Sequence, residues 1–340
     1  MQNIPKFPYG AVYFRKSNPP QSDWARDYQV AAEDGHNIFR HWFLWSAIEI
    51  KPGVFDWSDY DRQLDLAAEN GMKTIIAEMV TAAPEWAYHQ YSHARLETRS
   101  GEKINPVISG SCITGGFPGL CLDNEDFRAA AGNFLRELVL RYREHPGLGG
   151  YDIWNECNHG HDICYCPGTA VKFREWLQTK YDNLRELGQA WHRYSFSDWL
   201  QVTPPRQLGP YPDSLDWLQF RLDDAYRLMR WRTGLIRKLD TQHPVVAHGV
   251  AASLTRMAPG VADDWRAAAE VSAYGYTWGS SRHGDESWKQ VHAVDLVRAA
   301  SRDKPFWHAE AYAAPLWMQQ QVLGKPRHEG RIASPEDIRY

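Results

Sequence analysis

The sequence predicts an α/β fold, in which short apolar strands alternate with longer helices around a parallel sheet that is closed into a barrel or open. Two observations support this prediction. The segments 31–35 (AAEDG) and 67–71 (AAENG) each precede an apolar stretch and begin 36 residues apart, a spacing that fits one strand–loop–helix unit. Short apolar runs typical of buried strands recur later, at 150–154, 245–247, 271–274 and 306–309. Alternation of this kind is typical of parallel sheets covered by helices.

Each repeated segment is expected to end a helix at its glycine and to lead into a buried strand, near 38–39 in the first case and 74–77 in the second. Ser58 is the expected N-cap of the second helix, because its hydroxyl can accept a hydrogen bond from a free backbone amide. The N-terminal part of the chain therefore predicts successive strand–helix units.

A further helix is expected to begin near Asn124 and to end near 145–147 (HPG), and later helices are expected at 214–239 and 287–301. The apolar stripe of the first of these helices consists of residues at helical spacing, namely Phe127, Ala131, Phe134 and Leu138.

In total we expect seven strands, and the chain stops at Tyr340 inside what is predicted as the next helix, before an eighth strand. The segments 77–120 and 157–213 are long, aromatic and rich in Pro and Gly, which is typical of loops at the carboxyl face of a barrel. With no low-complexity linker between them, residues 1–340 are expected to form one catalytic domain.

Composition and charge exclude several function classes. The chain has 38 Lys and Arg against 42 Asp and Glu, a formal net charge of -4, and no run of basic residues, so nucleic acid is not an expected partner. No stretch approaches the ~20 apolar residues of a membrane span, and residues 1–10 lack the pattern of a signal peptide. We therefore expect a cytoplasmic protein. Aromatic residues reach 13%, which suits either a sugar site or a packed core.

Two glutamates occupy matching positions in the sequence. Asn155-Glu156 directly follows the apolar run at 150–154, and Glu310 directly follows the run at 306–309. Retaining glycoside hydrolases need two carboxyl groups across the scissile bond, one protonated to release the leaving group and one ionised to attack the anomeric carbon. Glu156 and Glu310 are therefore the candidate catalytic pair.

Several strings around these residues are similar to glycoside hydrolase family 42, the β-galactosidases, within the large clan of retaining (β/α)8 TIM-barrel hydrolases. The strings are FRHWFLWSAIEIKPGVFDWSDYDRQLDLAAENG (39–71), TAAPEWAYHQY (81–91), CYCPGTAVKFREWLQTKY (164–181) and YSFSDWLQVTPPR (194–206). The resemblance implies a TIM barrel that is apparently truncated after strand 7, with the C-terminal domains of the family outside this sequence. It also implies a homo-oligomer, a trimer.

The resemblance assigns roles to individual residues. It implies that Glu156 is the acid/base, that Asn155 contacts a sugar hydroxyl, and that Glu310 is the nucleophile. Arg40, expected at the end of the second strand, would position Glu310. Two aromatic residues would line the sugar pocket, Tyr276 and Trp317.

The implied function is that of a retaining exo-glycoside hydrolase, a β-galactosidase that removes terminal galactose from oligosaccharides or glycosides by double displacement. One departure concerns the sugar: the family carries an arginine shortly before its upstream cysteine, whereas residues 115–121 read GGFPGLC. An arabinopyranoside, β-glucoside or β-mannoside is therefore an alternative substrate. An endo-acting hydrolase of the same clan and a non-catalytic carbohydrate-binding barrel are further alternatives.

The catalytic chemistry needs no metal, but the resemblance implies a possible structural Zn²⁺ held by one upstream cysteine and a Cys-x-Cys-x-x-Cys run. Cys121, Cys164 and Cys166 match this pattern, whereas Thr169 stands where the last ligand would be. A closed zinc site needs four ligands. Residues that could supply the fourth are His159, His161, Asp162, Cys112 and Cys157.

Overall fold

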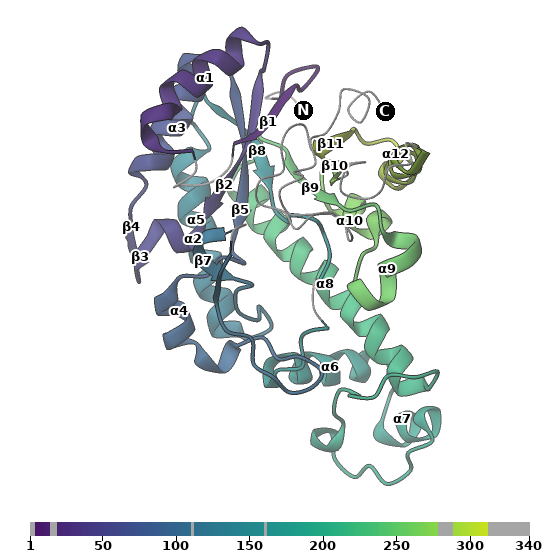
Figure 1. Ribbon diagram of the computed structural model, residues 1–340. Helices are drawn as coiled ribbons and strands as arrows, with labels where there is room; N and C mark the ends of the chain where they lie inside the picture. Colours follow the sequence, from purple (N-terminus) through teal and green to yellow (C-terminus); the bar gives the residue numbers. More distant parts are fainter. Residues whose placement is uncertain (1–3, 14–18, 110–111, 160–161, 278–287, 312–340) are drawn as a thin grey trace, which may run out of the picture.

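The structure of the chain is a computed structural model that describes residues 4–13, 19–109, 112–159, 162–277 and 288–311 (Figure 1). Within these residues one parallel sheet of seven strands has the order β1, β2, β5, β8, β9, β10, β11. The strands are β1 (Gly10–Tyr13), β2 (Ile38–Leu44), β5 (Lys73–Met79), β8 (Leu148–Asp152), β9 (Val245–Gly249), β10 (Ala273–Thr277) and β11 (Phe306–Glu310).

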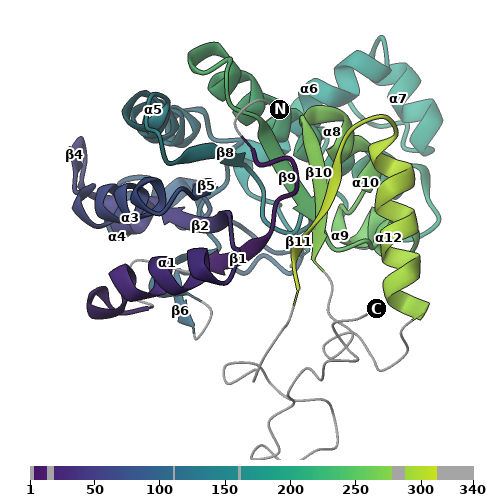
Figure 2. The ribbon, with the colours of Figure 1, turned by 90° about the horizontal axis from the view of Figure 1, so that it is seen from above.

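The sheet curves into a nearly closed barrel, with β1 and β11 as its edge strands (Figure 2). Helices connect successive strands and cover the outer face of the sheet. They are α1 (Trp24–Glu33), α3 (Ser58–Glu69), α5 (Glu125–Tyr142), α8 (Pro212–Leu239), α10 (Asp264–Glu270) and α12 (Trp288–Ser301). The predicted α/β barrel with seven strands is therefore confirmed.

The two repeated glycine segments end their helices in the same way. After α1, the amide of Gly35 donates to Ala32 O at 3.0 Å and the amide of His36 donates to Ala31 O at 2.9 Å. After α3, Gly71 and Met72 make the equivalent bonds to Ala68 and Ala67 at 3.1 and 2.8 Å. Both glycines have positive φ, +84° and +69°, which a glycine adopts without steric cost. The predicted helix ends are confirmed.

The predicted N-cap of α3 is wrong by one residue. The helix begins at Ser58 itself, so the N-cap position is Trp57, whose side chain makes no capping hydrogen bond. Asp56, just before it, accepts through Oδ1 from the Ser58 amide at 3.1 Å and from the Ser58 hydroxyl at 2.6 Å. A carboxylate is the stronger acceptor of the two side chains, and it also interacts favourably with the helix dipole. By contrast, α5 begins directly after Asn124, as predicted.

The two segments expected as loops contain ordered elements. Between β5 and α5 lie α4 (Glu85–Gln90), η2 (Ser92–Ala94) and the hairpin β6 (Val107–Ser109) with β7 (Cys112–Phe117). Between β8 and α8 lie α6 (Pro167–Lys180), α7 (Leu184–Trp191) and η3 (Trp199–Gln201). The second excursion folds because its aromatic side chains, among them Phe173 and Trp191, form a separate buried cluster with Trp217 of α8.

Shorter elements complete the described chain. They are η1 (Gln21–Asp23), α2 (Trp45–Ile48), β3 (Glu49–Lys51), β4 (Val54–Phe55) and α9 (Ser253–Gly260). Much of the aromatic content serves packing, since Trp45 stacks on Phe127 and Phe134 with ring centroids 5.6 and 5.5 Å apart in the main core. Among the described helices, none combines the length and hydropathy needed to cross a lipid bilayer.

Candidate active site

Arg40, in β2, joins side chains from β8, from β11 and from the loop that follows β8. Its Nε donates to Asp152 Oδ2 at 2.7 Å, its Nη1 to Glu310 Oε1 at 2.8 Å, and its Nη2 to Asn155 Oδ1 at 2.8 Å. The residue is the third of β2 rather than the last, so its expected place at the strand end is wrong, and it is only 5% exposed. The long side chain reaches the carboxyl ends of β8 and β11 from within the sheet. Arg40, Asp152, Asn155, Glu310 and His248, described below, are called the Arg40 network.

Opposite charges keep Asp152 and Arg40 of this network ionised. Burial by itself would raise the pKa of Asp152, but the charge of Arg40 and the hydrogen bond from His248 outweigh burial and hold that pKa below its ordinary value. Burial would likewise lower the pKa of Arg40, but Asp152 and Glu310 raise it. One guanidinium therefore serves two carboxylates, each through a charge-assisted hydrogen bond.

His248 is a member of the network that the sequence did not reveal. It lies in β9 and is fully buried, and its Nδ1 is 2.9 Å from Asp152 Oδ2. Its Nε2 accepts the backbone amide of Glu156 at 3.2 Å. Because Nε2 is an acceptor and Nδ1 faces a carboxylate, these partners assign the neutral tautomer with the proton on Nδ1. The only signal in the sequence is a polar residue within the apolar run VVAHG.

A glycine places β8 against β9 and so brings these groups together. A Cβ at Gly150 would lie 2.7 Å from the carbonyl oxygen of Pro244, which is too close, so only glycine permits this approach. The next residue, Tyr151, donates its amide to the same oxygen at 3.0 Å. Asp152 then ends the strand beside His248. Asn155 and Glu156 follow on the loop.

Glu310, at the end of β11, has a second contact from the neighbouring strand. Thr277 Oγ1 donates to Glu310 Oε2 at 3.2 Å, so each carboxylate oxygen accepts one hydrogen bond. The side chain of Glu310 is 17% exposed, which leaves part of it accessible from the barrel mouth. Of the two aromatic residues predicted to line the sugar pocket, Tyr276 is buried and stacks on His308 with ring centroids 4.4 Å apart. Trp317 lies outside the described residues.

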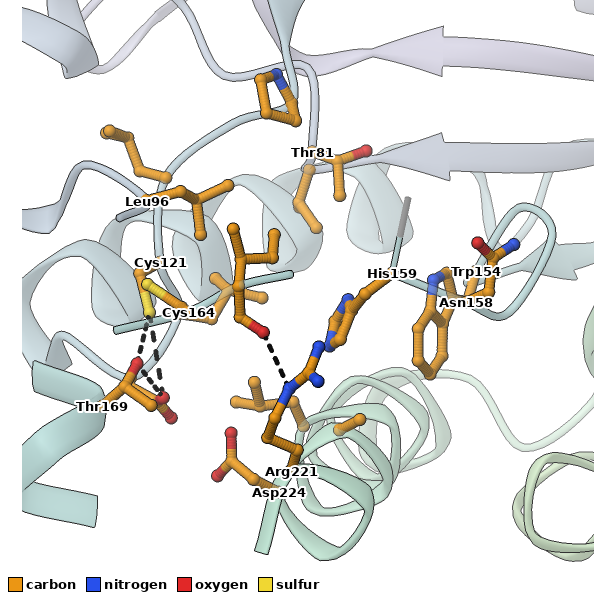
Figure 3. Close-up of a pocket in the computed structure, with 18 of the residues that line it drawn as sticks. Thr81, Leu96, Cys121, Trp154, Asn158, His159, Cys164, Thr169, Arg221 and Asp224 are labelled. Atoms are coloured by element: carbon orange, nitrogen blue, oxygen red, sulfur yellow. Dashed lines mark hydrogen bonds between the residues drawn. The ribbon is translucent and has the colours of Figure 1, made fainter. Parts of the chain in front are cut away.

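A cavity of about 330 Å³ is lined by Asn155 and by residues of the loops that follow β5 and β8. Trp154 and Asn158 lie at one end, and Cys164 and Thr169 at the other (Figure 3). His159 and Arg221 lie between them. Burial of the His159 ring, together with the nearby charges of Arg221 and Arg232, lowers the pKa of His159 to about 3. The ring is therefore neutral near pH 7.

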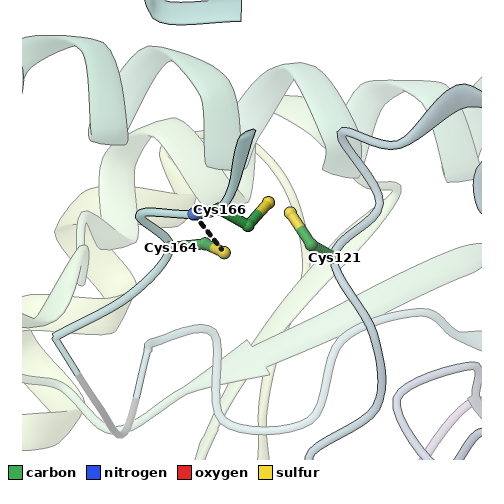
Figure 4. Close-up of side chains that lie close together, drawn as sticks. All are labelled: Cys121, Cys164 and Cys166. Atoms are coloured by element: carbon green, nitrogen blue, oxygen red, sulfur yellow. Dashed lines mark hydrogen bonds between the residues drawn. The ribbon is translucent and has the colours of Figure 1, made fainter. Parts of the chain in front are cut away.

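The three predicted metal-binding cysteines meet at the far end of this cavity. The sulfur atoms of Cys121, Cys164 and Cys166, called here the thiol cluster, all lie within 4.8 Å of one another (Figure 4). Such a group could hold a metal ion. Hydrogen bonds from the other two thiols lower the pKa of Cys166, whereas the bonds within the cluster raise that of Cys121.

Thr169 occupies the fourth position around the sulfurs. Its Oγ1 lies 3.2 Å from Cys121 Sγ and 3.6 Å from Cys166 Sγ, and it donates to Asp123 Oδ2 at 2.7 Å. Asp123, only 4% exposed, also lies 3.8 Å from Cys121 Sγ. The cysteine pattern of the sequence gives no indication of this carboxylate, which lies two residues after Cys121.

Most other candidates for a fourth ligand have different partners. Cys157 donates to Trp154 O at 3.5 Å, and Asp162 pairs with Arg99 and Arg221. His159 lines the cavity wall. His161 and the side chain of Cys112 lie outside the described residues.

Comparisons with known proteins identify the family of the chain. The model of glycoside hydrolase family 42, described as β-galactosidase, matches residues 13–334. A β-galactosidase of Heyndrickxia coagulans is 23% identical over 332 residues, covering 94% of this chain and 47% of the relative. One of Clostridium perfringens is 26% identical over 354 residues, covering 96% and 47%. The chain thus spans about half the length of these relatives.

Solved structures share the fold. The crystal structure of a β-galactosidase from Bacillus circulans sp. alkalophilus superposes with a TM-score of 0.80 at 19% identity, covering 100% of this chain and 49% of that one.

Proposed function

The chain belongs to glycoside hydrolase family 42, and on that premise we propose that it is a retaining β-galactosidase that releases terminal galactose. The observation that carries this proposal is the position of Arg40, whose guanidinium binds Glu310 and Asn155 at 2.8 Å each. Glu156 directly follows Asn155, so the two candidate catalytic glutamates lie at the ends of β8 and β11 on the same side of the barrel.

The proposed reaction has two displacements. In the first, Glu156 donates its proton to the glycosidic oxygen while a carboxylate oxygen of Glu310 bonds to the anomeric carbon and the bond to the leaving group breaks. In the second, Glu156 removes a proton from water, the water oxygen bonds to that carbon, and the bond to Glu310 breaks. Arg40 and Thr277 hold Glu310 in place, and Asn155 faces the sugar.

A panel of 4-nitrophenyl glycosides tests the proposal. The β-galactoside should be hydrolysed, whereas Glu310→Ala and Glu156→Ala should reduce kcat/KM by at least ~10²-fold. Azide should restore turnover in Glu156→Ala with formation of a β-glycosyl azide, because a small anion needs no base to attack the glycosyl-enzyme. A wild-type chain that hydrolyses no glycoside of the panel would contradict the proposal and favour a carbohydrate-binding barrel.

The identity of the sugar is part of the same proposal. Residues 115–121 contain no arginine, so one polar contact to the sugar that the family makes is replaced here. The panel therefore includes the α-L-arabinopyranoside, β-glucoside and β-mannoside. Preference for one of these would keep the mechanism and change the substrate.

We further propose that the thiol cluster holds a structural Zn²⁺ with an oxygen as fourth ligand. Three sulfurs within 4.8 Å of one another fit three Zn–S bonds of about 2.3 Å. Asp123 is the candidate for the fourth ligand, and Thr169, which hydrogen-bonds Asp123 Oδ2, is its alternative. Metal analysis should find about one zinc per chain, and Asp123→Asn should reduce this content more than Asp224→Asn. Absence of zinc after expression in zinc-supplemented medium would contradict this proposal.

Location and assembly are proposed from the sequence and the family resemblance. The partner is a carbohydrate substrate rather than nucleic acid or membrane, the location is cytoplasmic, and the assembly is a homotrimer. Cell fractionation and light scattering would test the last two.

A further inference from the structure

We infer that His248 is a positioning residue for Glu156, the proposed acid/base. This inference rests on the proposed function, because it assigns His248 a part in delivering the proton of that reaction. His248 lies in β9, which pairs with β8, and its side chain is fully buried beneath the loop that carries Glu156. It is therefore part of the rigid sheet and not of the loop.

His248 binds two successive amides of the loop. Its Nε2 accepts the Glu156 amide at 3.2 Å, and its backbone carbonyl accepts the Cys157 amide at 2.8 Å. The side-chain amide of Asn158 donates to Glu156 O and closes the turn. Two of the contacts that hold the backbone on either side of the Glu156 side chain thus come from one histidine.

The backbone of Glu156 makes these contacts necessary. Its φ is +53°, in the left-handed region that residues with a Cβ disfavour. Such a conformation persists only where the surroundings impose it. Without the bond to Nε2, the loop loses one of the interactions that hold Glu156 in this conformation.

The same ring connects Glu156 with Glu310. His248 Nδ1 donates to Asp152 Oδ2 at 2.9 Å, the same oxygen accepts Arg40 Nε at 2.7 Å, and Arg40 Nη1 binds Glu310 at 2.8 Å. One buried chain of hydrogen bonds therefore connects the backbone of Glu156 with the carboxylate of Glu310. Asp152 fixes the tautomer that lets Nε2 accept.

Two substitutions of His248 distinguish the role of Nδ1, which binds Asp152, from that of Nε2, which binds the Glu156 amide. The side-chain amide of His248→Asn ends near the position of Nδ1, so it can still donate to Asp152 but does not reach Glu156. The amide of His248→Gln extends to the position of Nε2, where its oxygen can accept the Glu156 amide. His243→Asn is the matched control, because His243 also pairs with an aspartate, Asp240, at 2.8 Å but lies outside the Arg40 network.

The decisive measurement is kcat/KM for two glycosides of the accepted sugar, one with 2,4-dinitrophenol and one with 4-methoxyphenol as leaving group. Dinitrophenolate leaves without a proton, whereas methoxyphenol needs one from Glu156. His248→Asn should lose about 10–100-fold on the methoxyphenyl substrate and under about threefold on the dinitrophenyl substrate. His248→Gln should recover part of the loss, and His243→Asn should behave as the wild type.

The ratio of the two values does not depend on how much of a preparation is folded. Equal losses on both substrates, or no loss in His248→Asn, would overturn the inference while the proposed function stands. A wild type inactive on both glycosides would overturn the proposed function and the inference with it.

Discussion

Asn155 of the Arg40 network lines the same cavity as Cys121 and Cys164 of the thiol cluster, and both regions gather polar side chains from distant segments into buried positions. The first contains its own cation, and each carboxylate in it accepts a hydrogen bond from that cation. Apart from their contacts with one another, the three sulfurs contact amides, a hydroxyl and the carboxylate of Asp123 among the described residues.

This difference indicates which of the two regions balances its charges with the protein's own side chains and which needs a bound ion. Buried carboxylates next to a fixed guanidinium are ready for chemistry without an added ion. Asp123 already has a cation, because Arg227 pairs with its Oδ1 at 2.7 Å, but the described contacts of the three sulfurs include no cation. Thiolates gathered around one point therefore need protons or a metal ion to balance their charge. We therefore expect mutations in the Arg40 network to alter activity and stability at any zinc concentration, and mutations in the thiol cluster to act through zinc.

The largest effect is expected for Arg40→Met, which leaves Asp152 and Glu310 without their cation. Removing one partner of a buried ion pair costs about 3–5 kcal/mol, so the free energy of unfolding in urea should fall by that amount. The value of kcat/KM should fall by about 10²–10³-fold. Arg62→Met removes an exposed pair with Glu69 and should change stability by under ~1 kcal/mol. Equal losses in the two variants would show that Arg40 has no special role.

A smaller and pH-dependent loss is expected for Asp152→Asn, because Arg40 keeps Glu310 as a partner. The folded-state pKa of Asp152 lies below its ordinary value of 3.8, so the carboxylate adds stability above about pH 4. This contribution disappears as the pH falls through the lower, folded-state pKa. The difference in unfolding free energy between wild type and variant should therefore be constant from pH 5 to 7 and should shrink below pH 4. A difference that grows on acidification would contradict the assignment.

Thr169→Cys should strengthen the other region by completing four thiolates. Saturation with zinc at about 100 times Kd stabilises a folded protein by ~2.7 kcal/mol, so the zinc-dependent rise in Tm should exceed that of the wild type. Thr169→Val keeps the shape of the side chain, removes the hydroxyl that donates to Asp123, and should not gain zinc affinity. If Thr169→Cys and Thr169→Val respond alike to zinc and to a chelator, the site does not bind metal through this position.

The sequence predicted the strands and helices that carry these regions, and it selected Arg40, Asn155 and Glu310, which the structure brings into contact. It missed Asp152 and His248, because a polar residue inside an apolar strand gives no indication of its partner. Asp152 meets Arg40 and His248 across 112 and 96 residues, pairings that only the folded sheet defines.

At the thiol cluster, the sequence identified the substitution by Thr169 but not its consequence. The hydrogen-bond acceptor of Thr169 is Asp123, 46 residues earlier. Asp123 comes two residues after Cys121, a spacing that matches no part of the cysteine pattern. The N-cap of α3 was missed for a related reason, since the backbone geometry, and not the capping ability of Ser58, decides that Ser58 is already the first helical residue.

The smallest effect is expected for Cys157→Ala. This substitution tests whether Cys157 acts with the Arg40 network or with the thiol cluster. Cys157 is 2% exposed, its amide binds His248 O, and its thiol donates to Trp154 O, so it lies with the Arg40 network. Loss of a buried sulfur should cost about 1 kcal/mol of unfolding free energy and should leave zinc content unchanged. Cys121→Ala, tested alongside, should reduce zinc content. Because Cys157 follows Glu156 directly, loss of zinc in Cys157→Ala would show that the two regions form one coupled site and not two.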